Sequence, residues 1–391
     1  MIFSFLIIYP LLLTCSFCIN NRKSFIVSYE DLLSRYNTRI AINSTYSFFI
    51  ELDLSINFIW ISDISIKDPN FITQFHNTPV QQLQINPYLQ FNYHNFDGSI
   101  TFETNQKVIP ISTEMMFITN RKTGYFDSIG LGFDGKFNDK SILNNLKHKG
   151  LINYRGFGFL KSKSFSYEGK LIFGEIPLNY IENKYYVSFP VVKGKNTWGC
   201  RITSVKIDNL SIYLVANHSY AEFSTKHSEI KVPKDIISIL KKDIFQRYIN
   251  NNTCQTIGSS IYCNSNIVAN FPNVSFYIMN CELNLTAKEM FVNEGKIQRF
   301  KIEENEIEPN NWSFGSVLIS KYLVYFDKEK SVITLYSDYP FSRDERNNRK
   351  YNDNDGNNIT MKKNICLVLI GVLFSYLMIL IINIVTNRKN K

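Results

Sequence analysis

Few side chains in this chain have the type and spacing that chemistry needs. Ser224 and His227 stand three residues apart, as a serine nucleophile and a histidine base can. A serine nucleophile also needs a sharp strand-to-helix turn with an oxyanion hole, and no such motif surrounds Ser224. The Gly130-Leu131-Gly132 segment lacks the further Gly and the Lys of a phosphate-binding loop. We expect no metal and no cofactor, because the five histidines show no metal-ligand spacing. They are His76, His94, His148, His218 and His227.

Asp53 is the other candidate, within the largely apolar segment LDLSINFIWIS (52–62). Carboxyl groups hydrolyse peptide bonds in pairs, because two of them about 3 Å apart share one proton. The ionised group activates a water molecule, and the protonated group polarises the scissile carbonyl. Asp53 supplies one of these roles, so its chemistry depends on what the rest of the fold brings beside it.

The composition indicates a globular chain rich in strands. Aromatic residues make up 15% of the 391 residues, which favours strands over helices. The net charge is +9, but residues 341–391 carry nine basic and four acidic groups, and the first twenty carry none. Residues 21–340 therefore hold 34 basic and 30 acidic groups, a balance that excludes a nucleic-acid-binding surface.

Short strand-like runs recur along the chain, and helical patterns are few. Turn signals such as Asp97-Gly98 separate some of these runs. The clearest helical patterns cover 138–148 and 233–249, the second starting with Pro233. The sequence predicts a mostly β protein with a few short helices.

Both ends of the chain are apolar. Residues 1–20 have the length and the small residues of a signal peptide, although the positive first region is missing. Residues 340–364 predict a disordered polar stalk, residues 365–385 a transmembrane helix, and residues 386–391 a cytoplasmic tail. A glycolipid-anchor signal is the alternative for the C-terminal run, disfavoured by the basic residues that follow it. This layout predicts a single-pass type I protein of the secretory or cell-surface membrane system.

Cysteines and glycosylation motifs agree with an oxidising compartment. Four cysteines lie between the two apolar ends and allow three pairings, among which the sequence does not choose. They are Cys200, Cys254, Cys263 and Cys281. Eight Asn-x-Ser/Thr motifs predict a glycoprotein. They begin at Asn43, Asn209, Asn217, Asn251, Asn273, Asn284, Asn311 and Asn358.

Six segments occur in the order and at the spacing of the sequence blocks of the pepsin family of aspartic proteases. Together they run from about Tyr36 to Tyr336, and this order makes the chain resemble that family. The two apolar ends resemble its membrane-anchored branch, of the β-secretase and plasmepsin type. The segments are LDLSINFIWIS (52–62), FNYHNFDGSITFE (91–103), YFDSIGLGF (125–133), GKLIFGEI (169–176), AEFSTKHSEIKVPKDI (221–236) and WSFGSVLISKYLVYFDKEKSVITLY (312–336).

The resemblance implies an all-β, two-lobed fold, with an N-terminal lobe over 21–192 and a C-terminal lobe over 193–339. It implies one catalytic Asp from each lobe and a flap hairpin that closes over an extended peptide. Asp53 matches the first catalytic Asp, and Ser224 stands at the position of the second. A gapless alignment puts Asn95 at the flap tyrosine, whereas a two-residue insertion keeps Tyr93. The residues that the resemblance assigns to the cleft and flap are Tyr93, Asn95, Asp97, Gly98, Ser99 and Thr225.

Both catalytic triplets depart from the family's Asp-Thr-Gly. Asp53-Leu54-Ser55 keeps only the carboxylate, and Ser224-Thr225-Lys226 keeps only the threonine. Lys226 adds a cation that favours the ionised form of a neighbouring carboxyl group. Glu222 lies two residues from the empty position and is a poor substitute. Gly132 and Gly315 are expected to allow tight packing behind the two loops.

These departures favour a catalytically impaired, membrane-anchored homologue that binds a peptide or protein in its interlobe cleft. Two alternatives stay open. One is an active aspartic endopeptidase with an altered dyad, and the other is a surface receptor or adhesin that uses the scaffold only for its loops.

Overall fold

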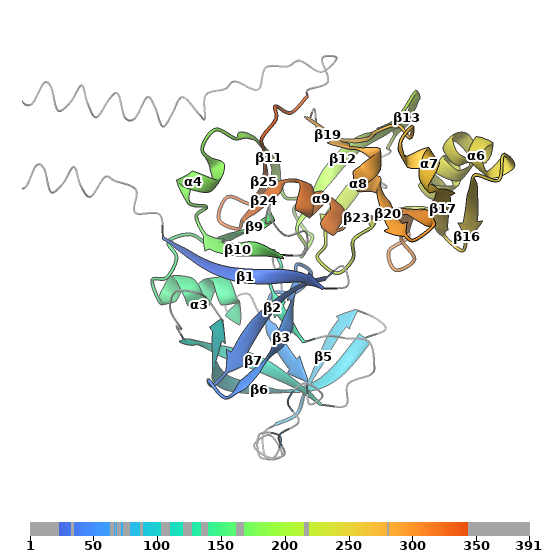
Figure 1. Ribbon diagram of the computed structural model, residues 1–391. Coiled ribbons are helices and arrows are strands. Elements are labelled where there is room, and N and C mark those ends of the chain that lie inside the picture. Colours follow the sequence, from blue (N-terminus) through green and yellow to red (C-terminus); the bar gives the residue numbers. More distant parts are fainter. Residues whose placement is uncertain are drawn as a thin grey trace, which may run out of the picture. The chain divides into compact units, whose positions relative to one another are not determined.

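The computed structural model divides the chain into two units, Met1–Arg343 and Asp344–Lys391, and the residues it describes all lie in the first (Figure 1). These are residues 23–32, 35–62, 66, 68, 72, 79–86, 89–102, 110–119, 127–133, 140–161, 168–214, 219–279 and 281–342. The predicted signal peptide, the predicted membrane span with its tail, and most of the predicted stalk lie outside them. Within the described residues, no helix is long and apolar enough to cross a membrane.

A 13-stranded sheet contains strands from both ends of the described chain. In Figure 1 the labelled strands of this sheet run from β11 down through β10 and β1 to β7 and β6. In order across the sheet, the strands are β11 (Tyr185–Pro190), β25 (Val332–Ser337), β24 (Leu323–Asp327), β9 (Gly156–Lys161), β10 (Glu168–Gly174), β1 (Ser24–Leu32), β2 (Arg35–Ile42), β3 (Tyr46–Asp53), β8 (Ser128–Gly130), β4 (Ile59–Ser62), β7 (Pro110–Thr119), β6 (Leu89–Phe102) and β5 (Gln81–Asn86).

Two further sheets form from the later part of the chain. The eight-stranded sheet contains β19 (Cys281–Leu285), β18 (Val274–Ile278), β12 (Gly199–Ile207), β14 (Tyr220–Phe223), β23 (Trp312–Phe314), β15 (Ile230–Val232) and β22 (Ile302–Glu304), with β13 (Leu210–Tyr213) paired to β12. The four-stranded sheet contains β16 (Cys254–Ile257), β17 (Ser260–Asn264), β21 (Ile297–Phe300) and β20 (Phe291–Glu294). The all-β, two-lobed fold that the sequence predicted is therefore confirmed.

The predicted lobe boundary at 192/193 falls between β11 and β12. The last two strands, β24 and β25, nevertheless return to the first sheet, where they pair with β9 and β11. Phe157 of β9 stacks on Phe326 of β24 at a centroid distance of 4.9 Å, and Trp198 lies 5.1 Å from the same ring. Aromatic packing of this kind joins the two parts of the chain through one core.

Helices are short, and both helical patterns found in the sequence correspond to helices. The predicted helix over 233–249 begins after Pro233 and runs through three segments, and the one over 138–148 begins at Ile142. Ser141 caps the latter by accepting a hydrogen bond from the Asn144 N–H. The helices are α3 (Ile142–His148), α4 (Leu178–Ile181), α5 (Lys234–Ile239), the π-helix η3 (Leu240–Phe245), α6 (Gln246–Asn250), α7 (Ser265–Val268), α8 (Ala287–Met290) and α9 (Ser316–Lys321).

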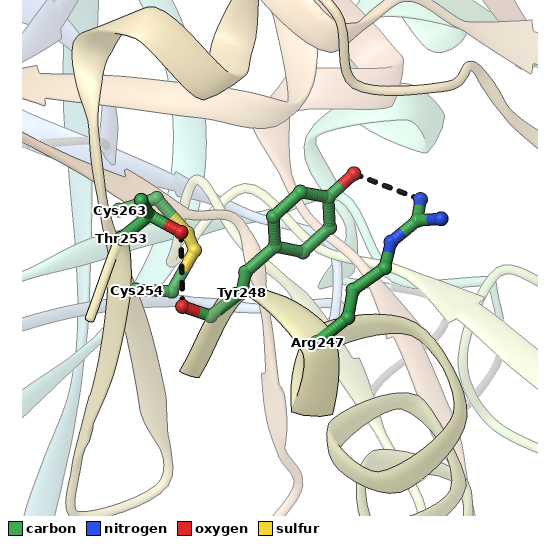
Figure 2. Close-up of a disulfide and its surroundings, with 5 residues drawn as sticks. All are labelled: Arg247, Tyr248, Thr253, Cys254 and Cys263. Atoms are coloured by element: carbon green, nitrogen blue, oxygen red, sulfur yellow. Dashed lines mark hydrogen bonds between the residues drawn. A yellow bond between two sulfur atoms is a disulfide. The ribbon is translucent and has the colours of Figure 1, made fainter. Parts of the chain in front are cut away.

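One disulfide settles part of the cysteine pairing that the sequence left open. Cys254 and Cys263 face each other across the β16–β17 hairpin and are bonded (Figure 2). Beside them the Thr253 hydroxyl donates to the Tyr248 carbonyl of α6 at 2.9 Å, which ties the hairpin to that helix. Cys200 and Cys281 are buried cysteines outside this disulfide.

Removing the disulfide should weaken the hairpin measurably. We expect Cys254→Ala/Cys263→Ala to lower the free energy of unfolding by about 2.5 kcal/mol, because the cross-link closes a loop of sequence separation 9. Denaturant unfolding with and without reductant provides the measurement. Reductant should destabilise the parent and leave the double variant unchanged, and an equal effect on both would contradict this assignment.

Candidate functional site

Two strand–loop units repeat the same backbone arrangement around Asp53 and Ser224. In the first unit β3 pairs in parallel with β8, and β8 pairs antiparallel with β4. In the second unit β14 pairs in parallel with β23, and β23 pairs antiparallel with β15. Asp53 ends β3 and Ser224 directly follows β14, so each residue lies at the end of the first strand of its unit.

Backbone hydrogen bonds make the correspondence residue by residue. The Gly130 N–H donates to the Phe58 carbonyl at 2.9 Å, and the Gly315 N–H donates to the Glu229 carbonyl at 3.0 Å. Phe58 lies five residues after Asp53, and Glu229 lies five residues after Ser224. Counted this way, Ser224 occupies the place of Asp53, Thr225 that of Leu54, and Lys226 that of Ser55.

The glycine behind each loop has no room for a side chain. A Cβ on Gly130 would lie 2.4 Å from the Phe58 nitrogen, and one on Gly315 would lie 2.2 Å from the Glu229 oxygen. Gly132, which the sequence analysis singled out, is equally close to the Ile56 oxygen at 2.6 Å. These neighbours are backbone atoms, so the loop itself would have to move.

Gly315→Ala should therefore unfold or strongly destabilise the second unit. We expect a loss of about 3 kcal/mol or more in the free energy of unfolding, since overpacking against backbone is not relieved by rotamer changes. Gly258→Ala is the control, because its backbone φ of +60° strains an alanine but no atom lies within 4 Å. That control should cost only about 1 kcal/mol, and equal losses in the two variants would show that space behind the loop is unimportant.

Asp53 is buried, with 1% of its surface exposed, and its two oxygens have different neighbours. Oδ1 accepts hydrogen bonds from the Ser55 N–H at 2.8 Å and the Ser55 hydroxyl at 2.6 Å. Oδ2 lies 2.8 Å from the Lys226 Nζ, in an ion pair. The Ser224 side chain, at the position of the second carboxylate, has only a hydroxyl, which accepts from the Lys226 N–H at 3.2 Å.

Lys226 thus places an ammonium group where a second carboxyl group would have to act. Its Nζ also donates to the Ser55 hydroxyl at 2.9 Å. Burial by itself lowers the pKa of Lys226, but the charges of Asp53, Glu51 and Glu222 outweigh it, and the net shift is upward. The lysine is therefore held protonated, and it neither serves as a base nor shares a proton with Asp53. Its side chain is nevertheless 42% exposed, and Ser55 is exposed as well.

Thr225 keeps one of the links between the two loops. Its side chain is fully buried, and its hydroxyl donates to the Leu52 carbonyl of β3. The Tyr36 N–H of β2 donates to the Thr225 carbonyl at 3.4 Å. Leu54, the counterpart of Thr225, is buried but has no hydroxyl, so its side chain cannot donate an equivalent hydrogen bond from the first loop to the second. Neither Ser55 nor Lys226 has a positive φ, so both accept a side chain without backbone strain.

Two acidic side chains surround the ion pair. Burial and the charge of Asp53 raise the pKa of Glu51, while Arg35, 3.1 Å away, opposes the rise. Burial and the charge of Glu308 raise the pKa of Glu222 to about 7, although a hydrogen bond with Thr197 and the charge of Lys226 act against this. The sequence analysis noted Glu222 only as a poor substitute for the missing carboxylate. Its titration near neutrality depends on burial, which the sequence did not signal.

The expected flap hairpin over 91–103 is not what forms. Residues 89–102 are one continuous strand, β6, and the Asp97-Gly98 turn signal lies inside its ladder with β7. Gly98 sits where a Cβ would lie 2.6 Å from the Met115 Cε, so this glycine serves close packing rather than a turn. β6 instead pairs antiparallel with both β5 and β7.

The assigned flap residues therefore separate into two groups. The Ser99 N–H donates to the Asn43 side chain at 2.9 Å. Asn43 precedes β3, whose other end is Asp53, so the two ends are about 25 Å apart at the usual rise of a strand. Ser99 therefore lies near the end of β3 that is remote from Asp53, and a role for Asp97, Gly98 and Ser99 against a peptide stays a prediction.

Tyr93 and Asn95 lie nearer to the loop of Asp53. Tyr93 is 3% exposed and belongs to an apolar cluster, which we call the loop cluster, and its hydroxyl donates to the Gln81 side chain at 2.7 Å. Asn95 is half-buried and pairs with Met116 of β7. A role for either against a peptide stays a prediction. The loop cluster consists of Ile56, Phe58, Trp60, Tyr93, Met116 and Ile118.

Within the described residues, no group of three or more His, Cys, Asp or Glu side chains could hold a metal ion. His227 does not serve Ser224 as a base either. Its Nε2 lies 3.0 Å from the Ser313 hydroxyl and its Nδ1 2.8 Å from the Glu229 carbonyl oxygen, and burial lowers its pKa to about 4.

The duplicated strand–loop units with a glycine behind each loop define a two-lobed aspartic protease scaffold. A family model for eukaryotic aspartyl proteases matches residues 98–337. This is more than half of the chain, which therefore belongs to that family. The match includes Ser224 and Lys226 and begins after Asp53. No curated protein sequence matches the chain.

Proposed function

We propose that this family member binds a peptide segment between its lobes without cleaving it, and that it does so at a secretory or cell-surface membrane. The observation that carries the proposal is the ion pair between Lys226 and Asp53 at 2.8 Å. Proton sharing between two carboxyl groups is what lets aspartic proteases activate water and polarise the carbonyl together. A lysine ammonium in that place stabilises the ionised carboxylate and provides no acid of suitable strength.

The same groups are suited to binding. A lysine ammonium has three donors, and those of Lys226 that face Asp53 and Ser55 leave one for a peptide carbonyl. Ser55 is exposed and adds a hydroxyl. Membrane attachment and glycosylation rest on the apolar segment 365–385, the N-terminal apolar run and the Asn-x-Ser/Thr motifs.

A binding experiment tests the proposal. The purified full chain is incubated with a mixed peptide library, and bound peptides are recovered and identified by mass. We expect a related set of peptides to be retained at full length. Ser55→Trp, which fills the space beside Lys226, should abolish retention, whereas Ser211→Trp on the exposed surface of β13 should not. Equal retention by both variants would place binding elsewhere.

A further inference from the structure

The corner of the 13-stranded sheet where β11 meets β25 exposes an unusual number of tyrosines. Tyr185 and Tyr186 open β11 with 52% and 53% of their surface exposed, and Tyr339, just after β25, is 79% exposed. Tyr336 lies opposite Tyr186, with ring centroids 6.0 Å apart. We call these four residues the tyrosine edge. Large aromatic side chains are seldom left in water without a partner surface.

The tyrosine edge presents aromatic rings on both faces of the sheet. Successive side chains of a strand point to opposite faces, so Tyr185 and Tyr186 flank the sheet at its border. β11 is the terminal strand in the sheet order, paired on one side with β25. Tyr186 and Tyr336 share the face whose small apolar cluster includes Tyr180 and Ile181 of α4. The amphipathic tyrosine side chains therefore lie on both faces of the sheet at its β11 border.

The chain leaves the sheet at this border. Tyr185 pairs with Ser337, the last residue of β25, and Tyr339 follows two residues later. The 22 residues 343–364 connect this part of the chain to the apolar segment 365–385. The sequence predicts a disordered stalk there, and a random coil of that length has an end-to-end distance of about 26 Å. A surface tethered so closely to a bilayer meets it at millimolar effective concentration, so weak contacts suffice.

Tyrosine chemistry fits the headgroup region of a bilayer. Its ring is apolar and its hydroxyl is hydrated, and for this reason tyrosines gather at membrane interfaces. The nearby Lys184 is paired with Asp338, so this lysine does not require anionic lipid as its partner. The outer backbone groups of β11 need water, which keeps the contact shallow.

We propose that the tyrosine edge rests in the headgroup region of the membrane that holds the chain and so fixes the orientation of the lobes above it. This inference rests on the membrane attachment in the proposed function. It gives the edge a lipid surface as its partner, and it predicts contact with neutral as well as anionic lipid.

Tryptophan fluorescence in bilayers provides the test. The three native tryptophans are buried, with Trp60 5%, Trp198 0% and Trp312 1% exposed, so they report little of the lipid. Full chains carrying Tyr185→Trp or Tyr213→Trp are placed in phosphatidylcholine nanodiscs, with acyl chains brominated near the glycerol or left plain. Tyr213 is a matched control, 70% exposed on β13.

We expect bromine to reduce the added fluorescence of Tyr185→Trp about twofold, as for a side chain at the headgroup boundary, and to leave that of Tyr213→Trp unchanged. Bromine placed at the chain ends should quench Tyr185→Trp less. If the chains insert into nanodiscs but bromine quenches both variants equally, the lipid contact of the tyrosine edge is wrong, and the membrane attachment is unaffected. If the fluorescence spectrum of Tyr185→Trp changes only when two chains share a disc, the partner of the tyrosine edge is a second copy of the chain and not lipid. Chains that fail to enter bilayers would overturn the membrane attachment as well.

Discussion

The Ser224→Asp variant should show no peptide hydrolysis between about pH 3 and 7, the range in which carboxyl dyads titrate. The variant supplies the missing carboxylate, but Lys226 keeps its ammonium 2.8 Å from Asp53. A cation in contact with one carboxylate, and beside the other, favours two ionised groups over one shared proton. The protonated partner that polarises the scissile carbonyl is then missing.

Removing the lysine should matter more than adding the aspartate. Combining Ser224→Asp with Lys226→Gly, Leu54→Thr and Ser55→Gly removes the ammonium and restores the second hydroxyl link between the loops. We expect weak cleavage at acid pH from this combination, because misplacement by about 1 Å can still cost a hundredfold in rate. The Ser224→Asn variant of the same combination is the inactive control. Robust turnover by Ser224→Asp alone would mean that the ion pair does not decide the chemistry.

The Glu222→Gln variant should be more stable than the parent at pH 8 and equally stable at pH 4. Burial beside Glu308 raises the Glu222 pKa from 4.5 to about 7 in the folded chain. The folded state then holds a proton that the unfolded state releases, so this group lowers stability as pH rises from 4.5 to 7. The full difference corresponds to about 3 kcal/mol, and partial solvation of the half-buried side chain reduces it to about 2 kcal/mol.

His227 has the opposite dependence, so the comparison must be between variants. Its pKa is lowered from 6.5 to about 4, and its contribution is lost as pH falls through that range. In the parent the two effects partly cancel, whereas the difference between Glu222→Gln and the parent isolates Glu222. Thermal unfolding across pH 4 to 8 measures it, with Glu306→Gln at an exposed position as the control. A difference that does not grow with pH would contradict a buried, neutral Glu222.

The sequence predicted the fold because each of its blocks corresponds to a backbone requirement. Gly315 is needed where a Cβ would meet the Glu229 carbonyl, and Ile50 and Leu52 are apolar because the end of β3 is buried. Such requirements fix residue types at these positions whatever chemistry the site performs. The duplication of the two units could be predicted only through the family resemblance, since Leu54 and Thr225, or Ser55 and Lys226, share no chemical type.

The site could be predicted only in part. The residue types at positions 224 and 226 already showed that the second carboxylate is replaced by Ser224 and that Lys226 adds a cation. The contact between Lys226 and Asp53 depends on a side-chain conformation that spans the two loops. The turn expected at Asp97-Gly98 does not form, because pairing with β7 on one side and packing on Met115 keep this dipeptide in a strand. Tertiary pairing outweighs local turn preference there.

The measurement that tests the central claim most directly is turnover by the purified parent chain. A mixed peptide library is incubated at pH values from about 3 to 7, and new peptide termini are sought by mass spectrometry alongside an Asp53→Ala variant. The lysine–aspartate pair predicts that no new termini appear above those of Asp53→Ala at any pH. Cleavage by the parent that Asp53→Ala abolishes would show that the altered dyad is an active one.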